Sequence, residues 1–256
     1  MPNEPTPFAP ALSRLFGRSK SSDVRDLLES AKQPGMISMA GGLPAAEFFD
    51  APGFLAAAQT VLAGHPEEAL QYGPTEGQAA LLALLAALLA GRGIEADGAD
   101  IVVTTGSQQA IDLFARALID PGDLVALEAP TYLAALQGFD LLKPRYLHGP
   151  STPHGLDVDW LAASGARPKL LYVVPTFANP TGSTLPLAQR VKLLHWAADN
   201  GVFVIEDDPY GEIRFAGSRE PSLYALAQRD ARLAPHVAYT STLSKVLAPG
   251  LRLGWI

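Results

Sequence analysis

A lysine near the end of this 256-residue chain has the surroundings of a reactive amine. Lys245 closes the hydroxyl-rich stretch STLSK and stands shortly before Arg252, just beyond an apolar run that indicates a strand. A lysine at a strand end, among hydroxyls and near an arginine, suits an amine that reacts rather than one that is only solvated. An ordinary surface loop can have the same composition, so the rest of the chain must decide.

The turn after the apolar run 101–105 has the composition of a phosphate-binding loop. Gly106 and Ser107 open a predicted helix, with Gln108 in its first turn. Backbone N–H groups at a helix N-terminus form a natural cradle for an anion. Ser107 could instead simply cap the helix, and the motif alone leaves both interpretations open.

Two further strand ends carry groups that could hold a flat, polar ligand. Tyr132 follows the run 124–127 and could stack on such a ligand, or it could lie in the core. Asn179 follows the run 170–174 and precedes a proline, which holds its backbone extended and its amide in place. A plain Asn-Pro turn would have the same sequence, so both alternatives remain here too.

An acidic cluster follows the apolar run 202–205. Glu206, Asp207 and Asp208 could bind a metal or clamp a protonated nitrogen, and Tyr210 follows Asp208 by two residues in EDDPYGE. Adjacent strand residues point to opposite faces of a sheet, which disfavours Glu206 and Asp207 as a glycosidase-type pair.

Rival chemistries lack their motifs in this sequence. GxxxxGK[ST], GxGxxG and GxSxG are absent. The five histidines show no metal-ligand spacing and the chain has no cysteine, so we expect no metal site. The candidate groups that remain are a phosphate-binding turn, an aromatic ring that could stack on a ligand, an asparagine, a carboxylate with a nearby tyrosine, a lysine and an arginine. That set suits pyridoxal 5′-phosphate, whose aldehyde forms a Schiff base with lysine and whose ring nitrogen needs an acidic partner.

The elements that position these residues alternate along the chain. The pattern predicts strands at 101–105, 124–127, 145–147, 170–174 and 202–205, and helices at 107–119, 132–142, 158–164 and 187–199. Short apolar strands alternating with amphipathic helices indicate an α/β domain with a mainly parallel sheet covered on both faces. Ligands bind at the carboxyl ends of the strands in such a sheet, which is where the polar residues stand.

Composition and charge argue against several classes of protein. The net charge of −7, with no long single-sign block, argues against a nucleic-acid partner. The apolar segment AALLALLAALLA at 79–90 falls well short of the roughly 20 residues of a membrane span, so it predicts a helix buried in a core or a subunit interface. The first ten residues lack the apolar core of a secretory signal. We therefore expect a cytoplasmic protein with no membrane partner.

Seven motifs, taken in order, resemble the class I/II aminotransferases of the fold-type I pyridoxal-phosphate family. The likeness points to the branch of aromatic and 2-aminoadipate (kynurenine-type) aminotransferases. The motifs cover most of the chain, and their joint order makes the match specific although each alone is weak. They are GGLP at 41–44, QYGPTEG at 71–77, TTGSQQAID at 104–112, EAPTY at 128–132, PTFANPTG at 175–182, EDDPYGE at 206–212 and STLSKVLAPGLRLGW at 241–255.

The resemblance implies a role for each polar residue around the cofactor. Lys245 would hold it as an internal aldimine, and Lys245, Asp207 and Tyr210 would be the catalytic residues. Asp207 would pair with the pyridine nitrogen. Asn179 and Tyr210 would hydrogen-bond the phenolic oxygen, and Tyr132 would stack on the ring. The residues implied to hold the phosphate are Ser107, Gln108, Thr242 and Arg252.

The resemblance also implies a homodimer. Tyr72 would reach the phosphate of the neighbouring subunit. The substrate would be contacted by Gly42, with Ser22 and Arg25 of the N-terminal segment. Residues 51–256 would form the large, cofactor-binding domain, and residues 1–50 an N-terminal arm and part of an incomplete small domain.

The implied function is a PLP-dependent aminotransferase of amino acid metabolism, which moves an amino group between an amino acid and a 2-oxo acid. Family members continue past Ile256, and their C-terminal domain supplies the arginine that clamps the substrate's α-carboxylate. The chain also stops inside the apolar run 251–256, which predicts a further strand. We therefore expect a C-terminally truncated sequence whose 256-residue form is poorly soluble or inactive.

Two other functions fit the same cofactor residues. One is a PLP-dependent amino-acid β-lyase, which product analysis would separate from an aminotransferase. The other is the ligand-sensing, aminotransferase-like domain of a transcription regulator. Such regulators carry an N-terminal helix-turn-helix, for which the proline-rich start of this chain leaves no room.

Overall fold

The computed structural model describes residues 11, 33–37 and 41–256 of the chain. The chain divides into two compact units, Met1–Gly42 and Leu43–Ile256, and each is described by itself. Ser22 and Arg25, predicted to contact substrate, lie outside the described residues. The division into an arm of residues 1–50 and a domain of residues 51–256 stays a prediction.

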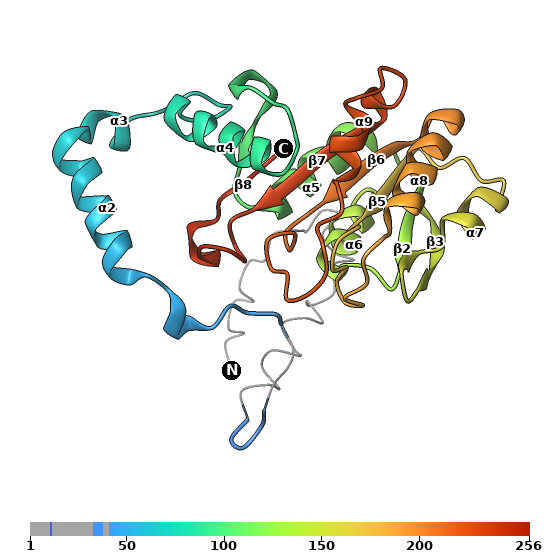
Figure 1. The fold of residues 1–256 in the computed structure, drawn as a ribbon, viewed down its shortest axis with the longest axis horizontal. Helices are drawn as coiled ribbons and strands as arrows, with labels where there is room; N and C mark the ends of the chain where they lie inside the picture. The colour runs from blue at the N-terminus through green and yellow to red at the C-terminus, as the bar shows by residue number, and fades with distance from the viewer. Residues whose placement is uncertain (1–10, 12–32, 38–40) are drawn as a thin grey trace, which may run out of the picture. The chain divides into compact units, whose positions relative to one another are not determined.

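An eight-stranded sheet forms the centre of the second unit, in the order β1-β8-β7-β6-β5-β2-β3-β4 (Figure 1). Along β7, β6, β5, β2 and β3 every neighbouring pair is parallel. β8 is antiparallel to both β1 and β7, and β4 is antiparallel to β3. The mainly parallel α/β sheet predicted from the sequence is confirmed. The strands are β1 Val103–Thr104, β2 Leu124–Ala129, β3 Arg145–Thr152, β4 Gly155–Leu156, β5 Leu170–Val173, β6 Phe203–Asp207, β7 Val237–Thr242 and β8 Gly254–Trp255.

The helices follow the sequence pattern closely where they connect parallel strands. The predicted helices coincide with α5, α6, α7 and α8 to within a few residues. β1 is shorter than the predicted run 101–105, although the Val102 N–H and carbonyl still pair with the backbone of Ile256 beside it. The helices are α2 Ala51–Gly64, α3 Pro66–Leu70, α4 Ala79–Gly91, α5 Ser107–Leu118, α6 Leu133–Asp140, α7 Val158–Ala163, α8 Leu187–Asn200 and α9 Leu223–Ala227, with 3-10 turns η2 Ala46–Phe48, η3 Gly98–Asp100, η4 Ala234–His236 and η5 Pro249–Leu251.

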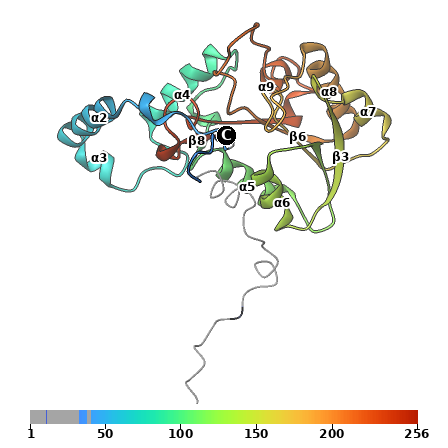
Figure 2. The same cartoon turned by 90° about the horizontal axis from the view of Figure 1, so that it is seen from below.

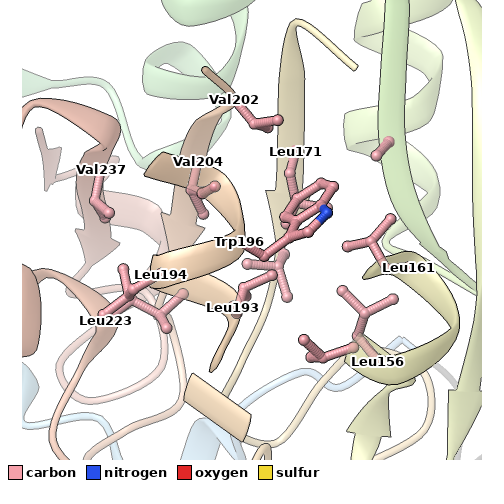
Figure 3. Close-up of a cluster of buried hydrophobic side chains, with 14 of the residues drawn as sticks. Leu156, Leu161, Leu171, Leu193, Leu194, Trp196, Val202, Val204, Leu223 and Val237 are labelled. Atoms are coloured by element: carbon pink, nitrogen blue, oxygen red, sulfur yellow. The ribbon is translucent and has the colours of Figure 1, made fainter. Parts of the chain in front are cut away.

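Both faces of the sheet are covered by helices and buried apolar side chains. Trp196 of α8 packs in one cluster with Leu171 of β5 and Val204 of β6 (Figure 3). The next residues along these strands, Tyr172 and Ile205, belong to a second cluster that includes side chains of α5 and α6. Figure 2 shows α5 and α6 on one side of the sheet and α8 and α9 on the other. Successive strand residues alternate between the faces, so a strand covered on both sides must be apolar throughout.

The helix α4, apolar in sequence on every side, is buried along one stripe only. Leu85 and Leu89 are buried and pack in a third cluster with Trp255, whereas Leu84 is 69% exposed. The expectation that the core of this chain buries the whole helix is therefore wrong, because the described residues pack against a single face. Burial of the other face in a subunit interface stays a prediction. No helix among the described residues is long and apolar enough to cross a membrane.

Candidate active site

The predicted site residues gather where the parallel strands end. Asp207 is the last residue of β6 and lies in register with Thr240 of β7, the strand that leads to Lys245. Tyr132 follows β2, which β5 separates from β6 in the sheet, and it lies close enough to Asp207 for that charge to affect its pKa. Burial raises the pKa of the Tyr132 hydroxyl, the charges of Asp207 and Tyr210 raise it further, and Arg252 lowers it. Residues far apart in sequence thus share one edge of the sheet, as expected for carboxyl ends of parallel strands.

Asp207 is a buried carboxylate with one oxygen satisfied and one unpaired. Its side chain is 2% exposed, and its Oδ2 accepts a hydrogen bond from the Tyr172 hydroxyl at 2.7 Å. Its Oδ1 is buried and has no hydrogen-bond partner among the described residues. Burial raises the pKa of Asp207 to about 7, with a further increase from the charge of Asp208, although the Tyr172 hydrogen bond opposes this rise. A buried oxygen of this kind needs a donor, and a protonated ring nitrogen is one.

The hydrogen-bond partners distinguish Asp207 from its two acidic neighbours. The two oxygens of Glu206 accept from the backbone N–H groups that open α9, at 2.8 and 2.9 Å. The two oxygens of Asp208 accept from the Tyr239 hydroxyl at 2.9 Å and the Gly211 N–H at 3.0 Å. Of the three acids, Asp207 alone has a buried, unpaired oxygen in the part of the chain that the structure describes. That part also contains no group of three or more side chains that could hold a metal ion.

Asn179, Tyr210 and Lys245 lie together beside Asp207. The Asn179 amide lies 3.4 Å from the Tyr210 hydroxyl, to which it donates. The Lys245 amine lies 6.0 Å from the centre of the Tyr210 ring. Lys245 is half-buried in the turn after β7, and this burial lowers the pKa of its amine below the usual value. A lysine with a lowered pKa is the form that reacts with carbonyl carbon at neutral pH.

The start of α5 and Arg252 form a compact cradle. Gly106 stands at the N-cap of α5 with φ of 75°, and no side chain caps the helix there. Arg252 donates from Nη2 to the Thr105 carbonyl at 3.2 Å. A methyl group at Gly106 would lie 2.6 Å from that same nitrogen. The absence of a side chain at this position therefore lets the guanidinium approach the helix N-terminus, a site that favours an anion.

Thr242 and Gln108 border this cradle. The Thr242 hydroxyl lies 2.8 Å from the Ser244 hydroxyl and also donates to the Leu253 carbonyl. The Gln108 amide nitrogen donates to the Ala134 carbonyl of α6 at 3.1 Å, so this nitrogen ties the two helices together.

The backbone around Arg252 differs from the strand predicted at 251–256. Leu251 ends the 3-10 turn η5, Arg252 has φ of 52°, and β8 begins only at Gly254. Pro249 in the first turn of η5 favours this local helical conformation over an extended one. The left-handed residue that follows directs the arginine toward Thr105.

The sequence also predicts contacts of Tyr72 with the cofactor and of Gly42 with the substrate. Tyr72 is 99% exposed, so the chain's own described residues leave its ring in solvent. Gly42 is the last residue of the first compact unit, whereas the site residues belong to the second. Their roles toward cofactor and substrate stay predictions.

Sequence reasoning missed two buried polar residues beside the site. Tyr172, fully buried in β5, supplies the donor to Asp207. Arg190 of α8, also fully buried, binds the segment that leads to Asn179 through the Pro175 carbonyl and the Thr176 hydroxyl. A signal for Tyr172 existed, because a tyrosine inside the apolar run LLYV needs a partner for its hydroxyl when buried.

A family model fits the same part of the chain that carries these residues. The model named "Aminotransferase class I and II" matches residues 45–256. The chain belongs to this family. Membership in the class I and II aminotransferases confirms the predicted family, and the fold-type I large-domain architecture is confirmed by solved structures.

Relatives of this aminotransferase family place the chain in the predicted branch. The chain is 42% identical over 254 residues to the 2-aminoadipate transaminase of Thermus thermophilus, covering 98% of this chain and 62% of that protein. The kynurenine aminotransferase of Pyrococcus horikoshii, solved with PMP, superposes with a TM-score of 0.87 at 40% identity over 95% of this chain and 61% of that one. The α-aminoadipate aminotransferase LysN of Thermus thermophilus, solved with N-(5′-phosphopyridoxyl)-L-leucine, gives 0.86 at 41% identity, covering 95% and 60%. This chain thus spans about three-fifths of the length of these relatives.

Proposed function

We propose that this chain forms the pyridoxal 5′-phosphate-binding part of an aminotransferase, which moves an amino group between an amino acid and a 2-oxo acid. The observation that carries the proposal is the buried, unpaired Oδ1 of Asp207, in a group with Tyr132, Asn179, Tyr210 and Lys245. The Thermus and Pyrococcus relatives, whose names or titles give transaminase activity and pyridoxal derivatives, support it.

The residues present fit this cofactor from one end to the other. The N-terminus of α5 with Ser107 and Gln108, together with Thr242 and Arg252, would hold the phosphate. Asp207 Oδ1 would accept the hydrogen of the ring nitrogen, which would satisfy the unpaired oxygen. The remaining contacts would come from Tyr132 on the ring face and from Asn179 and Tyr210 at the phenolic oxygen.

Lys245 would move the proton that defines the reaction. When bound, pyridoxal phosphate supplies an aldehyde that joins covalently to amines and a ring that withdraws electrons from the amino acid's Cα. Lys245 Nζ would attach the resting cofactor and, once released, take the proton from Cα. Burial lowers the pKa of this amine, so more of it is unprotonated and able to act as a base. The Asp207 carboxylate would keep the ring nitrogen protonated.

We also propose that the protein works as a homodimer in which Tyr72 reaches the partner's cofactor phosphate. The exposure of Tyr72 supports this arrangement. The described part of α2 has no buried residue, although Leu55, Val61 and Leu62 are apolar and at least 47% exposed. An apolar helix left uncovered favours contact with another protein surface. Contact of Gly42, Ser22 and Arg25 with substrate, and a cytoplasmic location, stay predictions from the sequence.

Cofactor attachment tests the proposal directly. The product of the complete gene, mixed with pyridoxal phosphate, is expected to develop a visible absorption band. Borohydride reduction and peptide mapping should then place the cofactor on Lys245. Lys245→Ala should abolish both signals, whereas Lys192→Ala, at an exposed lysine of α8, should leave them intact. A band that survives in Lys245→Ala would contradict the assignment.

Turnover separates the aminotransferase from the β-lyase, since both use the same cofactor residues. Incubation with an aromatic amino acid or 2-aminoadipate and a 2-oxo acid acceptor should yield a new amino acid from the acceptor. Release of ammonia and pyruvate, without amination of the acceptor, would instead indicate a lyase.

A further inference from the structure

Arg214 presents one edge of its guanidinium to a buried space that offers it no acceptor. Its Nε and Nη2 atoms are both buried, and neither has a hydrogen-bond partner among the described residues. These two nitrogens carry the parallel N–H groups that match the two oxygens of a carboxylate. Buried donors without an acceptor are unfavourable, so this edge is incomplete as it stands.

Two of the acids around Arg214, Glu212 and Asp208, are already engaged by other groups, and the third, Glu220, forms no ion pair with Arg214 among the described residues. The pocket it lines also includes Arg92, Arg190, Arg219, Asp208 and Glu220. Nearby, Glu212 pairs with Arg92 at 2.9 Å and with Arg219 at 2.5 Å. Both oxygens of Asp208 accept hydrogen bonds from Tyr239 and Gly211. Within residues 33–37 and 41–256, no ion pair neutralises Arg214.

Like charge is concentrated in this pocket. Burial lowers the pKa of Arg190, and although Glu206 and two other acids raise it, the charge of Arg214 lowers it further. Arg190 and Arg214 are therefore close enough to repel each other in a poorly solvated space. An anion at the free edge of Arg214 would relieve this repulsion and satisfy both donors at once.

Packing holds the edge in place before any ligand arrives. The Arg214 guanidinium carbon lies 4.8 Å from the centre of the Phe177 ring. Stacking of a guanidinium on an aromatic face fixes its plane and leaves its edge open to a planar acceptor. The lining residues include none of those proposed to hold the cofactor, so the pocket is separate from that site.

We propose that the Nε/Nη2 edge of Arg214 is a binding site for a carboxylate or a similar oxyanion with two oxygens on one face. The oxyanion is either a small solute or an Asp or Glu side chain of the same protein. Both sources would supply the same chemistry, namely two oxygens that accept hydrogen bonds from the Nε and Nη2 groups of Arg214. This site goes beyond the proposed function and does not depend on it.

Anion-dependent stability and calorimetry test the solute source. Thermal unfolding and titration calorimetry of the complete protein would use sodium acetate and inorganic phosphate, against sodium chloride at matched ionic strength. At least one of the two oxyanions should raise the Tm of the wild type saturably. Arg214→Lys keeps the charge but loses the two-donor edge, so its affinity should fall about tenfold or more. Arg116→Gln removes an exposed charge of α5 and should behave as wild type.

A crystal structure of the complete protein tests the second source. If the protein supplies the oxyanion, the Arg214 edge should carry an Asp or Glu carboxylate, and added acetate should leave the wild-type Tm unchanged. Arg214→Lys should then lower the Tm without any added anion. The proposal is overturned if neither oxyanion changes the Tm and the edge carries only water. It is also overturned if an oxyanion raises the wild-type Tm and raises that of Arg214→Lys equally. The cofactor band, measured in parallel, reports on the proposed function separately.

Discussion

The Tyr172 hydroxyl donates to Asp207 Oδ2 at 2.7 Å, joining the middle of β5 to the end of β6 inside the sheet. Both groups are buried, so the bond forms in a medium where electrostatic interactions are strong. It occupies one carboxylate oxygen and leaves Oδ1 buried without a hydrogen-bond partner among the described residues. Tyr172 thus fixes which oxygen is available to a cofactor, although it need not touch the cofactor itself.

Replacing Tyr172 with phenylalanine should weaken cofactor binding. The change removes a donor to a buried carboxylate, a loss of about 1–3 kcal/mol for hydrogen bonds to charged groups. The pKa of Asp207 should rise further, because the hydrogen bond that lowers it is gone. We expect the Kd of pyridoxal phosphate, measured by its visible band, to rise about tenfold.

A surface tyrosine provides the matched control for this change. The Tyr146 hydroxyl donates to Asp140 at 2.6 Å outside the site, so Tyr146→Phe should leave the Kd unchanged. Equal effects of the two substitutions would show that Tyr172 has no special role toward the cofactor.

The raised pKa of Asp207 predicts a pH-dependent stability of the cofactor-free protein. The carboxyl group keeps its proton up to about pH 7 in the folded state but loses it near 3.8 when unfolded. Folding therefore takes up a proton between these values, and the free energy of unfolding contributed by this group falls as pH rises from about 4 to 7. The change is at most about 4 kcal/mol, from about three pKa units.

Urea denaturation at a series of pH values checks this prediction with Asp207→Asn as the comparison. The substitution removes the titrating group, so the variant's stability should decline less between pH 4 and 7 than that of the wild type. Glu206, whose pKa burial also raises to about 7, titrates in both proteins and cancels in the difference. Parallel pH profiles for the two proteins would rule out a titrating Asp207.

Local patterns in the sequence were enough to predict the central sheet and its polar edge. The apolar run of β5 is buried at every position, and such runs occur where helices cover both faces of a strand. Because parallel strands end at one edge, the residues after each run were expected together, and Asp207 and Lys245 do lie there.

The remaining features depend on contacts that no local pattern contains. The bond from Tyr172 to Asp207 requires β5 and β6 to be neighbours, and strand order is set by the whole sheet. The exposure of Leu84 depends on which face of α4 finds a partner. The hydrogen bond from Arg252 to the Thr105 carbonyl joins residues far apart in the sequence.

A methyl group at Gly106 should damage the phosphate cradle. Gly106→Ala places Cβ 2.6 Å from Arg252 Nη2 and also forces an L-residue to adopt φ of 75°. The guanidinium must move away from the start of α5, so we expect the Kd of pyridoxal phosphate to rise by more than about tenfold.

Gly122 provides a control that distinguishes the steric clash at Gly106 from the backbone strain of a positive φ. Gly122 has φ of 91°, but a Cβ there meets nothing within 4 Å. Gly122→Ala should therefore lose roughly 1–2 kcal/mol of stability while it retains wild-type cofactor affinity. If Gly106→Ala binds the cofactor as tightly as Gly122→Ala does, the cradle is not the phosphate site.

Removing the Arg190 side chain should destabilise the protein by more than the loss of any one of its contacts would. The side chain is 0% exposed, and it donates to the Leu185, Pro175 and Pro221 carbonyls at 2.8, 2.7 and 3.1 Å. It also lies 3.9 Å from Glu206, whose carboxylate is equally buried. Arg190→Met would leave that charge and these carbonyls without their partner, which costs about 3–5 kcal/mol for a broken buried ion pair.

Arg190→Lys distinguishes loss of charge from loss of geometry. Lysine retains a positive charge near Glu206 but cannot reach three carbonyls at once, so its stability should fall between wild type and Arg190→Met. Chemical denaturation measures both changes, with Arg229→Met, at an exposed arginine, as the control.

Since Arg190 also binds Pro175 and Thr176, ahead of Asn179, the cofactor band of Arg190→Lys should shift even where the protein remains folded. An unshifted band in folded Arg190→Lys would show that Arg190 contributes to stability but does not affect the cofactor site.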